Sequence, residues 1–310
     1  MDCIPLGKTG LNVTVMGLGG GGPSRLGHNT GKDHANAVRV VRGALDAGIN
    51  FIDTAEAYGT EDAVGEAVAE HGRAKVVIST KVSTWQETSP DSIRASLAET
   101  LRKLRTDYVD IYHLHGVPPD RYAELAEMAV PVLQDMQRKG AIRFIGITEV
   151  FGRDTRHAML QRALQDDVWQ VIMVGFNLLN QTARATVFPV TQAKGIGTLI
   201  MFAVRRALSN PARLREVLDE LVASGEIDAD VVRGEDPLGF LVREYGAASV
   251  TDAAYRFCRY EPGAEVILSG TGDIAHLREN IASLDRPPLP DAAVQRLKTI
   301  FARVTSASGS

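Results

Sequence analysis

The sequence is poor in cysteine: its two cysteines, Cys3 and Cys258, lie far apart in a chain of 310 residues. Two cysteines are too few for a disulfide framework, and they do not show the spacing of a metal site. We therefore expect no bound metal, and we expect the protein to work in a reducing, cytoplasmic compartment.

Long apolar runs and a large excess of one charge are also absent. No stretch approaches the roughly 18 apolar residues that a membrane-spanning helix needs. The segment from Met1 to Gly7 has neither the basic nor the apolar part of a signal peptide. The formal net charge is only −4. The sequence thus gives no reason to expect nucleic acid or a membrane as a partner.

The chain contains a regular alternation of strand-like and helix-like segments. Apolar runs of strand length end near residues 18, 53, 81, 115, 148, 174, 202 and 268. Between them, apolar residues recur at helical spacing. Such alternation with short loops requires parallel strands joined by right-handed crossovers. Eight units favour an α/β fold of the (β/α)8 or TIM barrel type, with a doubly wound open sheet as the alternative.

Helices are expected over residues 33–47, 61–70, 92–104, 125–139, 154–164, 183–194, 251–260, 274–284 and 290–303. The segment from Ile4 to Val13 predicts an N-terminal hairpin that closes the lower end of the barrel. An irregular, partly helical insertion is expected over about 203–248, followed by extra C-terminal helices. The small, polar tail 305–310 is expected to be flexible. Because no repeat or linker separates two parts, residues 1–310 are expected to form one domain.

A glycine run, Gly17-Leu-Gly-Gly-Gly-Gly22, follows the first barrel strand. It matches the G-x-G-x-x-G pattern of dinucleotide-binding sheets, but that motif needs a helix to open at its last glycine. Here Pro23 follows instead, and the next helix begins only near Asp33. The run is better explained as a loop without side chains, which lets backbone approach a ligand, and Gly19 is a candidate contact.

Three of the strand-like runs carry ionisable side chains at their carboxyl ends, namely Asp53, Lys81 and His115, and the loop after the first adds Tyr58. In a barrel these ends share the face on which active sites lie. One such residue alone is more often a helix cap, a surface charge or a structural histidine. Four of them on consecutive units predict a single site.

Together these four side chains suit the transfer of a proton. A tyrosine with a pKa of about 10 is a poor acid at neutral pH. The Lys81 ammonium would lower that pKa, and Asp53 would keep the lysine charged and oriented. His115 would hold a carbonyl oxygen by a hydrogen bond. Because no protein side chain supplies the hydride that carbonyl reduction needs, a nicotinamide cofactor is expected.

A family resemblance rests on residues 48–59 (GINFIDTAEAYG), 79–81 (STK), 104–115 (LRTDYVDIYHLH), 140–148 (GAIRFIGIT) and 176–180 (FNLLN), with Glu279-Asn280 near the end. Over nearly its whole length the chain resembles the aldo/keto reductase superfamily. The resemblance implies a barrel in which Tyr58 is the general acid, Asp53 and Lys81 tune it, and His115 orients the substrate. His113 is assigned to the opposite side of its strand and is given no role.

The residues that would hold the nicotinamide depart from the family pattern. The family's Ser-Asn pair, which holds the carboxamide, is replaced by Thr148-Glu149; the glutamate can accept a hydrogen bond from the amide but cannot donate one. The family's glutamine on the sixth strand falls at Met173. For the aromatic residue that stacks on the ring, the candidates are Met201 and, after a shift of one residue, Phe202.

The phosphate contacts are also altered. Arg205 or Arg206 is expected to contact the pyrophosphate, with a solvated basic pair as the alternative. Around the expected 2′-phosphate site, glycines stand where the family often has a basic residue, and Asp273 would repel a phosphate. The sequence therefore indicates NADH or dual use, although the family favours NADPH. The cofactor-binding candidates are Gly19, Thr148, Glu149, Met201, Phe202, Arg205, Arg206, Ser269, Gly270, Thr271, His276, Glu279 and Asn280.

Trp85, in the polar loop 83–89, is a candidate wall of the substrate pocket, with packing on a neighbouring loop as the alternative. The expected activity is the interconversion of carbonyl compounds (aldehydes, ketones or sugars) and alcohols with NADP(H) or NAD(H). Sugar oxidation is included because the Gly-Ile-Thr form of the fifth strand is similar to sugar dehydrogenases of the family. The alternative function is a nicotinamide-binding, redox-sensing or regulatory subunit with little turnover.

Overall fold

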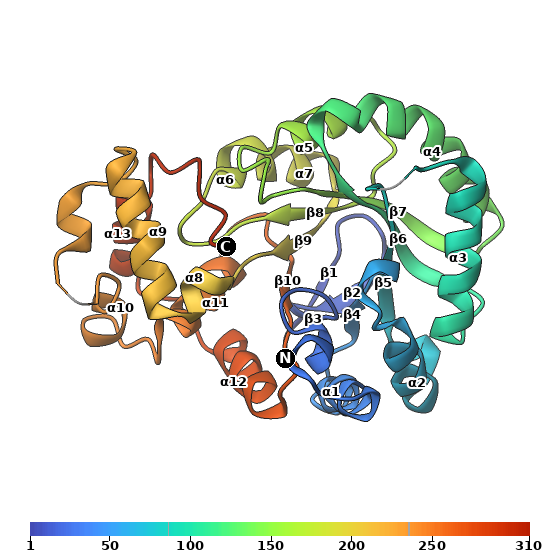
Figure 1. Cartoon of the computed structure of the whole chain (residues 1–310), viewed down its shortest axis with the longest axis horizontal. Coiled ribbons are helices and arrows are strands. Elements are labelled where there is room, and N and C mark those ends of the chain that lie inside the picture. Colours follow the sequence, from blue (N-terminus) through green and yellow to red (C-terminus); the bar gives the residue numbers. More distant parts are fainter. Residues whose placement is uncertain (86, 235) are drawn as a thin grey trace.

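The computed structural model describes residues 1–85, 87–234 and 236–310; Gln86 of the predicted polar loop and Glu235 of the predicted insertion lie outside the described residues. In the described ranges, eight parallel strands close into a barrel in the order β10-β3-β4-β5-β6-β7-β8-β9 (Figure 1). The predicted (β/α)8 barrel is confirmed, and the open doubly wound sheet is wrong.

The barrel strands follow the apolar runs of the sequence. They are β3 (Met16–Gly19), β4 (Phe51–Asp53), β5 (Val77–Ser83), β6 (Val109–Val117), β7 (Ile142–Glu149), β8 (Val171–Gly175), β9 (Gly197–Met201) and β10 (Val266–Ser269). All of β6 is buried, as expected for a parallel strand covered on both sides. Asp53 pairs with Ser79, and Lys81 pairs with His113, so β4, β5 and β6 are in register. Their carboxyl ends therefore meet at one face of the barrel.

The helices around the barrel begin where capping residues allow. They are α1 (His34–Asp46), α2 (Glu61–His71), α3 (Pro90–Leu104), α4 (Tyr122–Arg138), α5 (Ala158–Ala163), α6 (Ala183–Thr186), α7 (Phe188–Lys194), α11 (Val250–Arg259) and α12 (Ile274–Asp285). The Asp33 carboxylate accepts from the Asn36 N–H at 2.9 Å ahead of α1. Ser89 accepts from the Ser92 N–H at 3.1 Å ahead of α3, which opens with Pro90.

Two predicted helices differ from the structure. The helix expected over 183–194 is broken into α6 and α7 at Val187, because Pro189 has no N–H to donate and its ring crowds the preceding turn. The helix expected over 154–164 begins only at Ala158. The Asp154 carboxylate accepts from the N–H groups of Ala158 and Met159 at 2.8 Å, so it caps α5 from outside.

The predicted N-terminal hairpin is present and closes the amino end of the barrel. Its strands β1 (Cys3–Pro5) and β2 (Asn12–Thr14) pair antiparallel. Leu6 and Val13 are fully buried and pack with side chains of the barrel interior such as Phe51. The N–H of Lys8 donates to the carbonyl of Gly195, just before β9, at 2.8 Å. The hairpin thus buries apolar side chains at the end of the barrel that lies away from the carboxyl ends of the strands.

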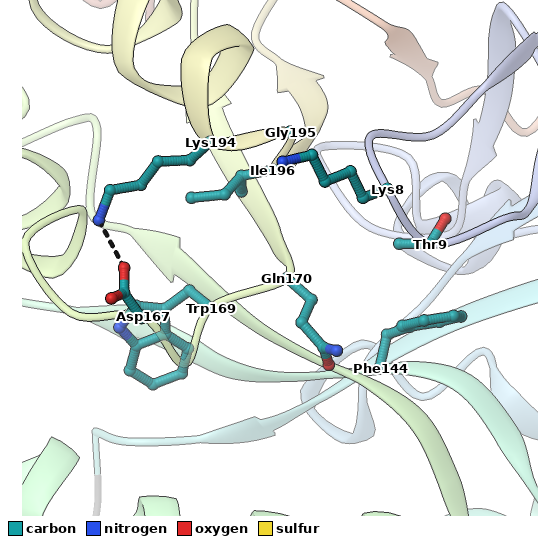
Figure 2. A pocket seen from close by; sticks show the side chains of 9 residues that line it. All are labelled: Lys8, Thr9, Phe144, Asp167, Trp169, Gln170, Lys194, Gly195 and Ile196. Carbon is teal, nitrogen blue, oxygen red and sulfur yellow. Dashed lines mark hydrogen bonds and ion pairs between the residues drawn. The ribbon is translucent and has the colours of Figure 1, made fainter.

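A cavity of about 420 Å³ lies beside this hairpin (Figure 2). Lys194 and Asp167, on its wall, form an ion pair of 2.8 Å. The Gln170 amide oxygen accepts from the Ile145 N–H at 3.0 Å, and the Trp169 indole donates to Tyr122 at 2.9 Å. These polar groups are bonded within the protein and lie at the opposite end from the predicted site.

The insertion forms a helical lobe together with the last helix. In Figure 1, α9 (Pro211–Ala223), α10 (Phe240–Arg243) and α13 (Asp291–Ile300) lie together at one side of the barrel. The short α8 (Arg206–Ser209) links the lobe to β9. The apolar side chains of α9 at Leu214, Val217, Leu218 and Leu221 are buried, as predicted. Among the described residues, no helix is both long and apolar enough to cross a bilayer.

The tail 305–310, expected to be flexible, contacts the barrel. The side-chain amides of Asn177 and Asn180 donate to the carbonyls of Ser308 and Ala307 at 3.1 and 2.9 Å. The N–H of Ala207 donates to Gly309 at 3.0 Å. Because the tail residues are small, their backbone lies close enough to accept these bonds.

Candidate active site

The four residues predicted to form a site come from three consecutive strands and one loop. Asp53 ends β4, Lys81 lies in β5, and His115 lies in β6. Tyr58 ends a short 3-10 helix, η2 (Glu56–Tyr58), just after β4. The structure brings all four together at the carboxyl-terminal face of the barrel.

A buried ion pair forms the base of the site. The Lys81 ammonium donates to both carboxylate oxygens of Asp53 at 2.7 Å and to the carbonyl of Thr54 at 2.6 Å. The Ser79 hydroxyl donates to the same carboxylate at 2.8 Å. The Lys81 side chain is 0% exposed. Its charge is tolerated there because nearby oxygens accept its N–H groups.

Tyr58 lies between this pair and His115. Its hydroxyl oxygen is 3.2 Å from His115 Nε2, and the Lys81 nitrogen is 5.0 Å from the centre of the phenol ring. The glycine run leaves room for this ring, since a Cβ at Gly21 would lie 2.5 Å from it. A 3-10 segment, η1 (Arg25–Thr30), follows the run. The structure therefore lacks the strand-glycine-helix arrangement of a dinucleotide fingerprint at this point.

The net shift in the pKa of Tyr58 differs from the prediction, although the Lys81 charge acts in the predicted direction. Burial raises the pKa of Tyr58, and the Lys81 charge opposes this effect without overcoming it. We predicted that Lys81 would lower this pKa. Burial of the phenol, which the sequence does not show, explains the difference, and the Asp53 carboxylate adds a smaller effect in the same direction. Burial and the Lys81 charge lower the pKa of His115 well below 6.5. Tyr58 is therefore protonated and His115 neutral at pH 7.

The assignment of His113 to the opposite side of its strand is wrong. Residues two apart share a side, so His113 faces the barrel interior as His115 does. Its Nε2 is 3.0 Å from the Ser79 hydroxyl. Gly146 leaves space for the ring, because a Cβ there would lie 2.2 Å from it. Ser79 and His113 thus support Asp53 from behind. The sequence analysis missed both, although the spacing of the two histidines was an available signal.

Two adjoining cavities open at this face, and they contain most of the predicted cofactor residues. The smaller, of about 140 Å³, is lined by Asp53, Tyr58, Gly19, Gly21, Met173, Met201, Phe202, Arg205 and Gly270, among others. The larger, of about 600 Å³, is lined by Arg205, Arg206, Gly270, Thr271, His276, Glu279 and Asn280, among others. Ser269 lies behind the wall, where its hydroxyl bonds Tyr255 and Asn280 at 2.8 and 2.9 Å.

Thr148 and Glu149 are not brought to these cavities. The Thr148 hydroxyl accepts from the Gly116 N–H at 2.7 Å. The Glu149 carboxylate is bonded to His157 Nδ1 at 2.9 Å and accepts from the Gly175 N–H at 2.8 Å. Burial raises the pKa of Glu149, and His157 opposes that effect. This buried carboxylate takes its donors from the protein and lines neither cavity, whereas a contact with the carboxamide was predicted. Sequence reasoning missed His157, which only the fold brings near.

Arg205, which lines both cavities, and Arg206, which lines only the larger one, make this side of the site positive. The Arg205 guanidinium lies 4.3 Å above the centre of the Phe202 ring, and its Nε donates to Ser310 at 3.2 Å. Burial and the neighbouring Arg206 charge lower the pKa of Arg205. The two positive charges beside this cavity favour an anionic ligand over a cationic one.

The amino end of α12, where the resemblance places a 2′-phosphate, is occupied by protein groups. The Asp273 carboxylate accepts from the Ala275 N–H at 2.8 Å and lies 3.1 Å from the Lys32 ammonium. Lys32 also donates to the carbonyl of Gly272 at 2.8 Å. Gly272 packs against Gly27, since a Cβ on it would lie 2.4 Å away. Sequence reasoning found Asp273 but missed Lys32, which comes from a distant loop.

Trp85, predicted as a wall of the substrate pocket or as a side chain packed on a neighbouring loop, lies beside His115 and is not among the lining residues of either cavity. The centre of its ring is 4.7 Å from that of His115, at an angle of 47°. The residue is 59% exposed. A Cβ at Gly116 would lie 2.6 Å from its indole nitrogen, so the glycine makes room for it. An exposed aromatic ring thus stands beside the imidazole of the site.

Comparison with known proteins identifies the family. The sequence profile described as the Aldo/keto reductase family matches residues 15–302, which is most of the chain. The chain belongs to the aldo/keto reductase family. It is therefore related to oxidoreductases that use NAD(P)H, and the resemblance predicted from the strand-end motifs is confirmed.

Among individual aldo/keto reductases, an L-galactose dehydrogenase of Arabidopsis thaliana is 25% identical over 291 residues, covering 90% of this chain and 86% of its own. An NADH-specific methylglyoxal reductase of Escherichia coli is 32% identical over 222 residues, covering 63% of this chain and 65% of its own. The holo form of an aldo-keto reductase of Bacillus halodurans superimposes with a TM-score of 0.76 at 22% identity, covering 99% of this chain and 97% of its own. This last likeness concerns the fold alone.

Proposed function

We propose that this aldo/keto reductase interconverts small carbonyl compounds and alcohols with a nicotinamide cofactor, and that Tyr58 is its general acid and base. One observation carries the proposal. The Tyr58 hydroxyl lies 3.2 Å from a neutral His115, and the buried pair of Lys81 and Asp53 stands directly behind it. A carbonyl oxygen placed at the phenol and the imidazole would meet two hydrogen-bonding groups at once.

The protonation state of the phenol sets its role in each direction. Burial raises the pKa of Tyr58, so the phenol holds a proton at neutral pH that it can donate in carbonyl reduction, and the Lys81 charge offsets part of the burial effect. The phenol O–H bond breaks as the substrate oxygen gains the proton, and Lys81 stabilises the resulting phenolate. A bound reduced nicotinamide supplies the hydride for the carbonyl carbon. In alcohol oxidation the phenolate is the base, so oxidation is favoured by alkaline pH.

The residues at the two cavities fit such a cofactor. Gly270 lies close to the backbone of Gly19, since a Cβ on Gly270 would lie 2.9 Å from the Gly19 carbonyl oxygen. The absence of a side chain there keeps the wall between the two cavities thin. The cavities share Arg205, whose charge suits a pyrophosphate. The Ser24 hydroxyl, on the wall of the larger cavity, is a buried polar atom without a protein partner among the described residues. A buried hydroxyl normally has a hydrogen-bond partner, and a polar ligand in this cavity would supply one.

The occupied amino end of α12 supports a preference for NADH. The Asp273 carboxylate already accepts a hydrogen bond from the Ala275 N–H at the start of the helix, and it already forms an ion pair with Lys32. A 2′-phosphate would have to displace this carboxylate and would be repelled by it. An E. coli relative bears the name of an NADH-specific reductase, which points the same way.

The substrate class is proposed from the exposed ring of Trp85. An aromatic face beside the His115 imidazole suits a small aldehyde or the ring of a sugar, which packs on aromatic side chains. The names of two relatives, an L-galactose dehydrogenase and a methylglyoxal reductase, cover both classes. We also propose a cytoplasmic location, since both cysteines are free thiols.

A substrate panel with Tyr58→Phe as the matched variant tests the proposal. Methylglyoxal, other small aldehydes and aldohexoses would be assayed with NADH and NADPH by the absorbance of the reduced nicotinamide. We expect turnover in the wild type and a loss of at least about a hundredfold in kcat for Tyr58→Phe, the scale of a general acid. Undiminished turnover in Tyr58→Phe would refute the role of the phenol. Tight NADH binding without turnover on any substrate would favour a redox-sensing or regulatory protein instead.

A further inference from the structure

The nicotinamide ring of the cofactor must be positioned by side chains other than those that bind its carboxamide in the family pattern. Under the proposed function, the nicotinamide must lie in the smaller cavity, because Tyr58 lines it. The side chains of Thr148 and Glu149 are turned to protein partners, and Met173 has no hydrogen bond to offer the amide. Phe202 lines the same cavity and presents an aromatic ring. The ring of Phe202 is therefore the side chain on which the position of the nicotinamide depends most.

Phe202 has a backbone conformation that must be held by its surroundings. Its φ is +67°, in the left-handed region, which non-glycine residues adopt at a cost. The Asn177 side chain donates to the Phe202 carbonyl at 3.2 Å. The edge contact between the rings of Phe202 and Phe151 has a centroid distance of 5.6 Å and an angle of 87°. Phe151 is thus one support of the ring, and the Arg205 guanidinium, 4.3 Å from the ring centre, is another.

Phe151 is in turn held on two sides. Its ring stacks on His157 with an angle of 7° and a centroid distance of 5.4 Å. On the other side it fills the space left by Gly175, where a Cβ would lie 2.1 Å from the ring. Phe151 is 1% exposed, so it has little freedom to move. The position of this ring therefore depends on His157 and on the end of β8.

Glu149 fixes both of these supports. Its Oε1 accepts from the Gly175 N–H at 2.8 Å, and the same atom lies 2.9 Å from His157 Nδ1. The other ring nitrogen of His157 is 2.8 Å from the Thr182 hydroxyl. The side chains of Glu149 and His157 are both 0% exposed. One buried carboxylate thus ties the end of β7 to the end of β8 and to the start of α5.

We propose that Glu149, His157 and Phe151 are positioning residues that hold the ring of Phe202 against the nicotinamide end of the bound cofactor. The carboxylate that replaces the family's asparagine works through an aromatic stack and makes no contact with the cofactor. This inference rests on the proposed function, because it takes from that function the nicotinamide and its place beside Tyr58.

Binding measurements separate this role from a general structural one. Isothermal titration would compare NADH with ADP-ribose, which has no nicotinamide, for the wild type, Phe151→Leu, His157→Gln and the double variant. We expect the Kd for NADH to rise about threefold to tenfold in Phe151→Leu, the worth of one lost aromatic contact. The Kd for ADP-ribose should stay within about twofold. Because His157 acts through Phe151, the double variant should bind NADH no more weakly than Phe151→Leu.

Phe188→Leu is the matched control. Phe188 is also 1% exposed and also makes an edge contact with another ring, Phe176, at 5.2 Å. It does not line either cavity. This variant should lose stability without changing the ratio of the two Kd values. Thermal unfolding shows that each variant is folded, and His157→Gln carries the test alone if Phe151→Leu does not fold.

Four results would overturn the inference. They are an equal weakening of NADH and ADP-ribose binding, no weakening of either, effects of His157→Gln and Phe151→Leu that simply add, and a wild type that binds both compounds with the same affinity. Failure of the proposed function looks different, since the wild type would then bind neither compound, or would bind NADH without turnover of any carbonyl or alcohol substrate.

Discussion

The Lys81 ammonium depends on Asp53, because the lysine side chain is fully buried and the carboxylate is nearly so. Replacing only the lysine, as in Lys81→Met, leaves a buried carboxylate without its partner. We expect a loss of about 3–5 kcal/mol in the free energy of unfolding, which is typical when one member of a buried ion pair is removed. The kcat should fall by at least about a hundredfold, because nothing then stabilises the phenolate of Tyr58. Urea unfolding and steady-state kinetics measure the two effects.

The double variant Asp53→Asn/Lys81→Met separates stability from catalysis. Removing both charges leaves no unpaired ion, so most of the lost stability should return. The activity should not return, because the tyrosine still lacks the lysine. A double variant that recovers kcat together with stability would show that Lys81 acts only as a structural residue.

Single residues could be predicted where their position in an element decides their role. Asp53, Lys81 and His115 stand at strand ends, and parallel strands must place such ends together. Glu149 was misjudged because its partner His157 lies beyond a loop, with a left-handed backbone that no local pattern indicates. The direction of the Tyr58 pKa was misjudged because burial depends on the loops around it, whereas the sequence shows only which charges are present.

The proposed preference for NADH rests on the groups at the amino end of α12. In Asp273→Asn, the repulsion of a 2′-phosphate disappears and Lys32 loses its carboxylate partner. We expect the ratio of kcat/KM for NADPH over NADH to rise roughly tenfold, in line with one charge interaction near the surface. Lys32→Ala should lower the same ratio, because Asp273 is then uncompensated.

Asp285→Asn is the control for this change. Asp285 ends the same helix, where it pairs with the amino-terminal nitrogen of Met1 at 3.7 Å. Its removal should leave the ratio unaltered. A ratio that is equally large in the wild type and in Asp273→Asn would mean that the 2′-phosphate binds away from α12.

Elements were predicted well where apolar spacing and capping residues agree, as at Asp33 and Pro90. They were predicted poorly where one residue overrides the spacing. Pro189 divides a segment with helical spacing into α6 and α7. The loop that carries Lys32 reaches α12 through contacts between residues more than 200 positions apart. Local sequence has no signal for such contacts.

At the scale of the whole molecule, the barrel could be predicted because eight similar units leave few ways of closing a parallel sheet. The helical lobe could not, since α10 and α13 are in contact, with the Arg296 guanidinium 3.8 Å from the centre of the Phe240 ring, although α11, β10 and α12 separate them in the chain. The tail is a similar case. Its composition indicates flexibility, while its contacts with Asn177 and Asn180 depend on the finished barrel.

The stability of the whole molecule should decrease as pH falls below about 6.5, because the fold buries His113 and His115 as neutral rings. Burial lowers the pKa of both well below 6.5. In this pH range the unfolded chain binds protons that the folded chain does not, so the free energy of unfolding falls with pH. Each histidine contributes a slope of up to about 1.4 kcal/mol per pH unit.

Comparing the wild type with His113→Gln isolates this contribution from that of the carboxyl groups. Burial raises the pKa of Asp53 and of Glu149, so these groups favour the folded state as pH falls and partly mask the histidines. They are present in both proteins, and their effect largely cancels in the difference. Urea unfolding from about pH 7.5 to 5 should give a shallower pH dependence for His113→Gln, by up to the slope of one histidine. Parallel curves for the two proteins would mean that His113 takes up its proton inside the folded barrel.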